Sequence, residues 1–155
     1  MHEAPILICY DGSDAARDAI VAAAALLGRR QAVVLDVGPL DVVAESFAAG
    51  YAFDGYPPYG ADPEETDRLV ADAALACAAA GAELARAAGF LAEARAEIDA
   101  PAWRGIVDVA DQIDAAVIVI GSRGLTGIRE LVEGSVSHQV AVHAGRPVLT
   151  VPPSR

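Results

Sequence analysis

Five strand-like runs alternate with four stretches of helical periodicity, and this alternation limits the fold more than any other feature of the sequence. The runs cover residues 6–10, 32–37, 92–98, 116–120 and 148–151. Parallel strands need a crossover, and a right-handed crossover lays its helix on one face of the sheet, so the pattern predicts a doubly wound α/β fold. We expect a five-stranded parallel sheet in the order 3-2-1-4-5, with helices on both faces, in a single domain over residues 1–155.

The helical stretches have recognisable ends and apolar faces. Ser13 is a typical N-cap for the first helix, and Gly28 is a typical stop. The other helices are expected over residues 64–88, 102–113 and 135–144. Apolar or small residues recur at helical spacing in the second helix, and we interpret all of them as core, a cysteine included: Val70, Ala74, Cys77, Gly81 and Leu84.

A ligand site is expected where the strand order reverses, outside the carboxyl ends of the strands. In this sequence that rule selects the loops that follow Tyr10 and Ile120. The second loop, residues 121–133, is rich in glycine and leads into a helix. Amides at a helix N-terminus favour an anion, and glycines admit phosphate oxygens without a Cβ clash. The loop therefore predicts a phosphate-bearing ligand.

Four residues around this loop have a long and specific spacing. Gly121 is followed by two residues, then Gly124, then nine residues, then Gly134 and Ser135. In this pattern the chain resembles the ATP-binding branch of the universal stress protein family. The resemblance extends to the first strand with its Asp11-Gly12-Ser13 and to the closing segment 145–151, and so covers almost the whole chain apart from residues 38–63.

The resemblance implies an adenine nucleotide, ATP or alternatively AMP or ADP, with Mg2+. It places the nucleoside contacts on Asp11 and the backbone of Val37, with Tyr10 and Ile120 beside them. From the residues alone, Asp11 has an equally simple role in holding its turn. The implied ribose and phosphate contacts are Gly121, Arg123, Gly124, Gly134, Ser135, Val136 and Ser137.

Three features depart from the family pattern. Asp36 stands where many relatives have His, and Arg146 stands where a Cys often precedes the closing Pro. Residues 38–63 form a long segment rich in proline, glycine and aromatic residues. Loops of this length are commonly functional, so it is either a lid over the base or a patch that packs against the body of the protein.

Composition excludes several classes of function. The net charge is -11 and all eleven basic residues are Arg, which opposes binding to nucleic acid and excludes a P-loop or Schiff-base lysine. No apolar run is long enough to span a membrane and no signal peptide is evident, so we expect a cytoplasmic protein.

The cysteines and histidines give no sign of a cross-link or a metal site. Cys9 and Cys77 favour free thiols over a disulfide. His138 and His143 are five residues apart, which misses the helical spacing of a zinc pair, so no metal site is assigned.

These observations favour a nucleotide-dependent regulatory protein that acts in a stress response. No catalytic residue is assigned, because no general base is evident near the loop and no Lys can neutralise a transferring phosphoryl group. The first alternative is a slow ATPase or phosphotransferase in the same pocket. The second is an interaction module without nucleotide, which the complete glycine pattern opposes.

The two edges of the expected sheet differ in charge. The third strand alternates charged and apolar residues, which discourages edge pairing, whereas the fifth strand, residues 148–151, has no charge. Relatives in the family pair this last strand with its two-fold mate, so we expect a homodimer joined there, with Leu149 and Val151 among its contacts.

Overall fold

Five parallel strands form one sheet in the computed structural model, which describes residues 3–39, 63–99, 101–122 and 136–154. The order is β3-β2-β1-β4-β5, which confirms the predicted topology. The strands are β1 (Ile6–Cys9), β2 (Gln31–Pro39), β3 (Leu91–Asp99), β4 (Val117–Gly121) and β5 (Val148–Val151).

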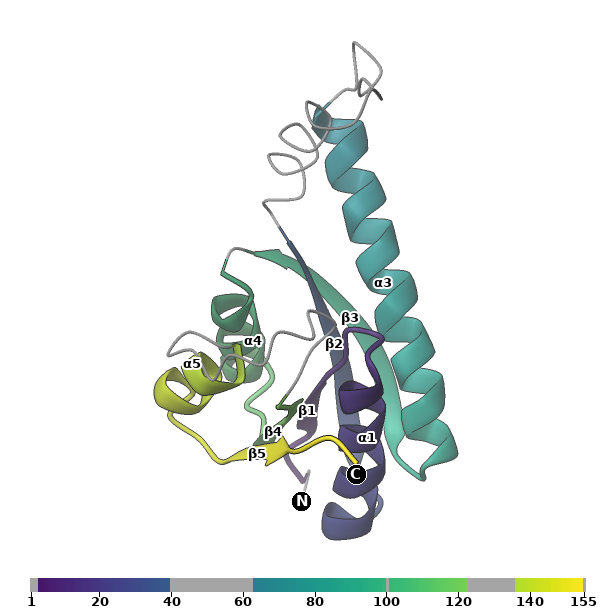
Figure 1. Ribbon diagram of the computed structural model, residues 1–155, viewed down its shortest axis with the longest axis vertical. Coiled ribbons are helices and arrows are strands. Elements are labelled where there is room, and N and C mark those ends of the chain that lie inside the picture. Colours follow the sequence, from purple (N-terminus) through teal and green to yellow (C-terminus); the bar gives the residue numbers. More distant parts are fainter. Residues whose placement is uncertain (1–2, 40–62, 100, 123–135, 155) are drawn as a thin grey trace.

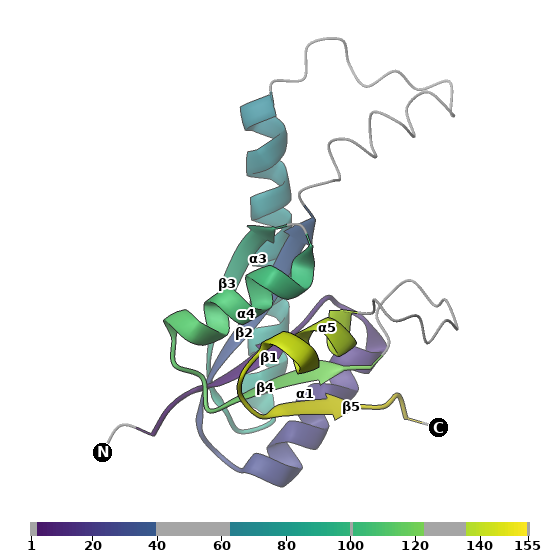
Figure 2. The same ribbon diagram turned by 90° about the vertical axis from the view of Figure 1, so that its left-hand side faces the viewer.

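Helices cover both faces of this sheet (Figures 1 and 2). The pair α1 (Asp14–Leu27) and α3 (Pro63–Ala87) lies on one face, and α4 (Ala102–Gln112) and α5 (Val136–His143) lie on the other. Alternate residues of β1 serve the two cores: Ile6 and Ile8 face the first pair of helices, whereas Leu7 and Cys9 face the second. None of the helices that the structure describes is long and apolar enough to cross a membrane.

The ends of α1 confirm the predicted capping residues. The Oγ of Ser13 accepts a hydrogen bond from the amide of Ala16 at 3.2 Å, which satisfies a donor of the first turn. Gly28 ends the helix at a φ of 69°, in the left-handed region that favours glycine, and its amide donates to the carbonyl of Ala24.

The predicted apolar face of α3 is correct except at its last position. Ala74 and Gly81 are buried, and Val70 and Cys77 are half-buried. Leu84 is 41% exposed, so its prediction as a core residue is wrong. The buried positions continue through Ala78, Ala82 and Ala85, and Leu84 lies about 100° around the helix from Ala85.

The second strand is longer than its apolar pattern indicates. Gly38 and Pro39 pair with Ile98 and Asp99 of β3, so the long loop does not begin at Gly38 as predicted. Gly38 is buried, and a Cβ there would lie 3.1 Å from the Cγ1 of Val70, so the Val70 side chain would have to shift. Residues 40–62, and with them the lid and packing interpretations, lie outside the described residues.

Candidate functional site

The carboxyl edge of the sheet brings the predicted nucleoside residues together. Asp11 follows β1, Val37 lies near the end of β2, and Gly121 ends β4. Strands β1 and β4 are neighbours, and they are the point where the strand order reverses. In a crossover the helix runs antiparallel to the strands, so the N-terminus of α5 lies at the same edge. This is the location that the sequence rule selects.

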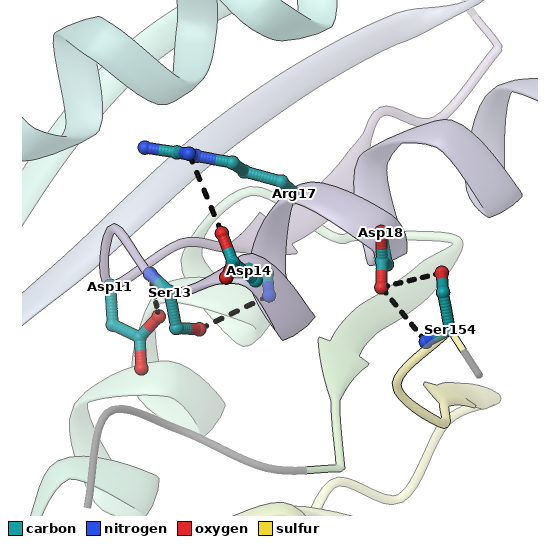
Figure 3. Close-up of polar contacts among 7 residues, drawn as sticks. Asp11, Ser13, Asp14, Arg17, Asp18 and Ser154 are labelled. Atoms are coloured by element: carbon teal, nitrogen blue, oxygen red, sulfur yellow. Dashed lines mark hydrogen bonds and ion pairs between the residues drawn. The ribbon is translucent and has the colours of Figure 1, made fainter.

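The loop between β1 and α1 is held by its own side chains (Figure 3). The Oδ1 of Asp11 accepts a hydrogen bond from the amide of Ser13 at 2.9 Å, while the residue as a whole is exposed. Gly12 between them has a φ of 81°. The turn-holding role of Asp11 is therefore confirmed, and its second carboxylate oxygen leaves the residue able to contact a ligand as well.

Tyr10 directly follows β1 and Ile120 lies near the end of β4, so both border this edge of the sheet. Tyr10 is 4% exposed and Ile120 is 6% exposed, because both side chains belong to the cores on either side of the sheet. The amide of Tyr10 donates to the carbonyl of Leu35 at 2.9 Å, which ties the loop to β2. These two residues shape the edge, and their side chains are part of the packing.

Gly121 has a packing reason to be glycine. A Cβ at this position would lie 2.8 Å from the carbonyl oxygen of Ala15, so the end of β4 rests directly on the first turn of α1. The next residue, Ser122, donates its amide to the carbonyl of Val151 at 2.9 Å. The start of the glycine loop is thus fixed between α1 and β5.

Asp36 is a site residue to which sequence reasoning gave no role. It is half-buried on the α3 side of β2, and burial raises the pKa of its carboxyl, as does the negative charge of Asp11. Hydrogen bonds with the Cys77 side chain and the Val37 backbone act against this rise in pKa. A carboxyl group inside an otherwise apolar strand was the signal that could have identified it.

Both cysteines are free thiols. Cys9 is buried and Cys77 is half-buried, and desolvation is the main cause that raises the pKa of each thiol to about 12. The Sγ of Cys77 also lies 3.9 Å from the carbonyl oxygen of Tyr10. Neutral thiols in these positions support the prediction that both are core residues.

The phosphate end of the site is described in part. Val136 and Ser137 form the first turn of α5, with Val136 39% exposed. First-turn amides have no partner within their own helix and point out of its N-terminus. Arg123, Gly124, Gly134 and Ser135 lie outside the described residues.

His143 of α5 is held by an aromatic ring and a backbone carbonyl. The ring of His143 stacks on Trp103 of α4, with 4.4 Å between ring centroids, and its Nδ1 lies 2.8 Å from the carbonyl oxygen of Gln139. In the part of the chain that the structure describes, no three His, Cys, Asp or Glu side chains are grouped so that they could hold a metal.

Comparison with known proteins identifies the family. The family model described as "Universal stress protein family" matches residues 4–152. The universal stress protein YxiE of Bacillus subtilis (strain 168) is 34% identical over 148 residues, which are 94% of this chain and 97% of YxiE. The chain belongs to the universal stress protein family.

Solved structures of other proteins share the fold of this universal stress protein. The protein MJ0577 superposes with a TM-score of 0.72 at 21% identity, covering 100% of this chain and 99% of MJ0577. The universal stress protein from Archaeoglobus fulgidus in complex with dAMP has a TM-score of 0.59 at 23% identity, covering 97% of this chain and 99% of that protein. The dAMP is bound to the Archaeoglobus fulgidus protein and not to this one. At sequence identities of 21% and 23%, the structural similarity establishes the fold alone.

Proposed function

We propose that this universal stress protein binds an adenine nucleotide, ATP or alternatively AMP or ADP, and acts as a nucleotide-dependent regulator in the cytoplasm. One observation carries the proposal: Asp11, Val37 and Gly121 converge at the edge where the strand order reverses, and the sequence there has the complete glycine spacing. The dAMP bound to the Archaeoglobus fulgidus relative supports the same class of ligand. Two free thiols suit a reducing compartment.

The proposed contacts divide between the two ends of the nucleotide. The nucleoside lies against Asp11 and the backbone of Val37, bordered by Tyr10 and Ile120. The ribose and phosphates lie over the amides at the start of α5. Their contacts come from the glycine-rich loop and the first turn of that helix: Gly121, Arg123, Gly124, Gly134, Ser135, Val136 and Ser137. An anionic ligand is stabilised there by the amides and the helix dipole.

Mg2+ enters the proposal as a partner of the phosphates. The protein has a net charge of -11, which repels a free polyphosphate, and a bound divalent ion lowers that repulsion. Mg2+ commonly keeps water ligands and binds phosphate oxygens, so the proposal requires no cluster of carboxylates.

Calorimetry tests the binding. We expect ATP with Mg2+ to bind the wild-type protein, and a Gly124→Val, Gly134→Val double variant to lose binding because the added side chains fill the space of the phosphates. Circular dichroism checks that the variant folds. Unchanged ATP affinity in the folded variant would contradict the site, and analysis of the nucleotide released on denaturation identifies which one copurifies.

A slow ATPase or phosphotransferase is the second candidate and uses the same pocket. The phosphate contacts can stabilise charge in a transition state, but no base for water is assigned and the chain has no Lys. A phosphate-release assay with Mg2+ and ATP separates the two, since a regulator that stores nucleotide releases phosphate on a timescale slower than its nucleotide exchange.

A homodimer through β5 completes the proposal. The strand lies at the edge of the sheet next to β4, and within the described residues no other strand pairs with its outer side. Val151 is only 8% exposed in the core beneath α1, so its side chain is little available to a partner, whereas Leu149 is half-buried against that core and its part in the dimer contacts stays a prediction. Pairing through the backbone of β5 is therefore the form of dimer that we propose.

A further inference from the structure

A single carboxylate of α1 fastens the segment that follows β5 (Figure 3). The Oδ2 of Asp18 accepts two hydrogen bonds from Ser154, one from its amide at 2.9 Å and one from its hydroxyl at 2.7 Å. The two bonds lower the pKa of Asp18, so the acceptor is ionised at neutral pH. Hydrogen bonds to an ionised acceptor are stronger than neutral ones. We call these two bonds the tail clasp.

The tail clasp lies close to the contact that holds the glycine loop. Val151 pairs with Gly121 in the sheet, and its carbonyl accepts the amide of Ser122 at 2.9 Å. Only Pro152 and Pro153 separate Val151 from Ser154. Proline rings fix φ, so this spacer is short and stiff. A displacement of Ser154 is therefore transmitted to the carbonyl that holds Ser122.

The same helix also touches the end of β4 directly. A Cβ at Gly121 would lie 2.8 Å from the carbonyl oxygen of Ala15, so the backbones of β4 and α1 are in close contact there. Asp18 follows Ala15 by three residues, and residues at this spacing are neighbours on one side of a helix. The first two turns of α1 therefore hold Gly121 by contact and hold Ser122 through the tail.

We propose that Asp18 and Ser154 are positioning residues for the nucleotide site, because the tail clasp fixes the start of the glycine loop. The proposal rests on the proposed function, which supplies the ligand of that loop. Neither residue needs to touch the nucleotide. Opening the clasp removes one restraint next to the Val151 carbonyl, so the bond from that carbonyl to Ser122 is held less firmly, and a site that spends less time in its binding geometry binds with a proportionally lower apparent affinity.

Two variants open the clasp by different means. Asp18→Ala removes the acceptor, and Ser154→Asp places a second negative charge against Asp18. In calorimetry with ATP and Mg2+ we expect each to weaken affinity by about five- to tenfold. The double variant should bind no more weakly than Asp18→Ala alone, because the repulsion requires both carboxylates. Asp14→Ala is the matched control, since its side chain is 96% exposed on the same helix and pairs with Arg17, and its affinity should stay within about twofold of wild type.

Hydrogen exchange at one amide gives a second readout that needs no nucleotide. The amide of Ser122 should exchange faster in Asp18→Ala than in wild type or Asp14→Ala, while the interior of α1 keeps its protection. Wild-type affinity in both clasp variants, or unchanged exchange at Ser122, would overturn the positioning role. A wild-type protein that binds no adenine nucleotide would instead overturn the proposed function, and the two failures are therefore distinguishable.

Discussion

Asp36 is a charged residue in a half-buried position of β2. Its carboxyl is half-buried beside Cys77 and within the field of Asp11, and its pKa is raised above the ordinary value of 3.8. A carboxyl that holds its proton more tightly in the folded state stabilises the fold below the unfolded pKa. That contribution is lost as the pH rises through the folded pKa.

A neutral isostere at this position should therefore stabilise the protein at neutral pH. We expect Asp36→Asn to have a larger free energy of unfolding than wild type at pH 7, and the difference to shrink as the pH falls toward 3.8. Urea unfolding at both ends of that range measures it, with Asp14→Asn at an exposed position of α1 as the control for the loss of one carboxylate. An Asp36→Asn protein that is less stable than wild type at pH 7 would contradict the desolvation argument.

At the residue scale, the sequence predicts local roles better than contacts between elements. The cap at Ser13 and the stop at Gly28 depend on a few consecutive residues, and both are confirmed. The packing reason for Gly121 depends on how closely α1 approaches β4, and the pairing of Asp18 with Ser154 joins residues 136 positions apart. No local pattern encodes such approaches, so they could not be predicted.

Gly81 shows how α3 is fitted to the sheet at the scale of the element. A Cβ there would lie 2.6 Å from two ring atoms of Tyr10 and 2.9 Å from the Cγ1 of Val34. Alanine is the better helix former by about 1 kcal/mol, which alone would make Gly81→Ala stabilising. The ring is buried and its hydroxyl accepts a hydrogen bond from the Arg17 guanidinium, so it has little room to move.

We therefore expect Gly81→Ala to destabilise the protein by about 1 to 3 kcal/mol, in spite of its helix propensity. Chemical denaturation measures the change. Exposed Ala80→Gly is the neighbouring control and should cost about 1 kcal/mol through propensity alone. If Gly81→Ala were as stable as wild type or more so, α3 would have to shift away from the sheet more easily than this packing indicates.

Element existence and order could be predicted, whereas element ends and faces were less certain. All five strands and the four expected helices are present, because alternation of strand and helix is repeated along the whole chain. The strand β2 extends through Pro39 because its pairing with β3 continues beyond the apolar run. Leu84 was predicted to be in the core but is exposed, because an alanine-rich helix can bury its alanines and leave a leucine on the outside.

At the scale of the whole molecule, the sheet has two unlike edges. The edge strand β3 carries three charged residues, Glu93, Arg95 and Glu97, and the last two are paired by hydrogen bonds from Arg95 to the Oε1 of Glu97. Charges along an edge oppose the addition of another strand. Strand β5 has none, and it is the edge at which we propose the dimer.

The backbone of β5 indicates which residue controls that pairing. The carbonyls of Pro147 and Val151 accept hydrogen bonds from Ile118 and Ser122 of the β4 side, so the intervening Thr150 presents its amide to the outer side. Thr150 is also exposed. Proline at this position removes the outward donor, leaves the bonds to β4 in place and is tolerated on an edge strand. By contrast, an acidic residue at Val151 would disrupt the core of each protomer and could not report on the dimer.

We expect the wild-type protein to sediment as a dimer at concentrations of about 10 micromolar and Thr150→Pro to sediment as a monomer with an unchanged circular dichroism spectrum. Thr150→Val keeps the outward amide and should remain dimeric, which separates the loss of the donor from the loss of the hydroxyl. The same runs with ATP and Mg2+ show whether the nucleotide shifts the equilibrium, because Ser122 of the glycine loop is bonded to the strand that forms the proposed interface. A monomeric wild-type protein, or a Thr150→Pro variant that stays dimeric, would rule out pairing through this edge.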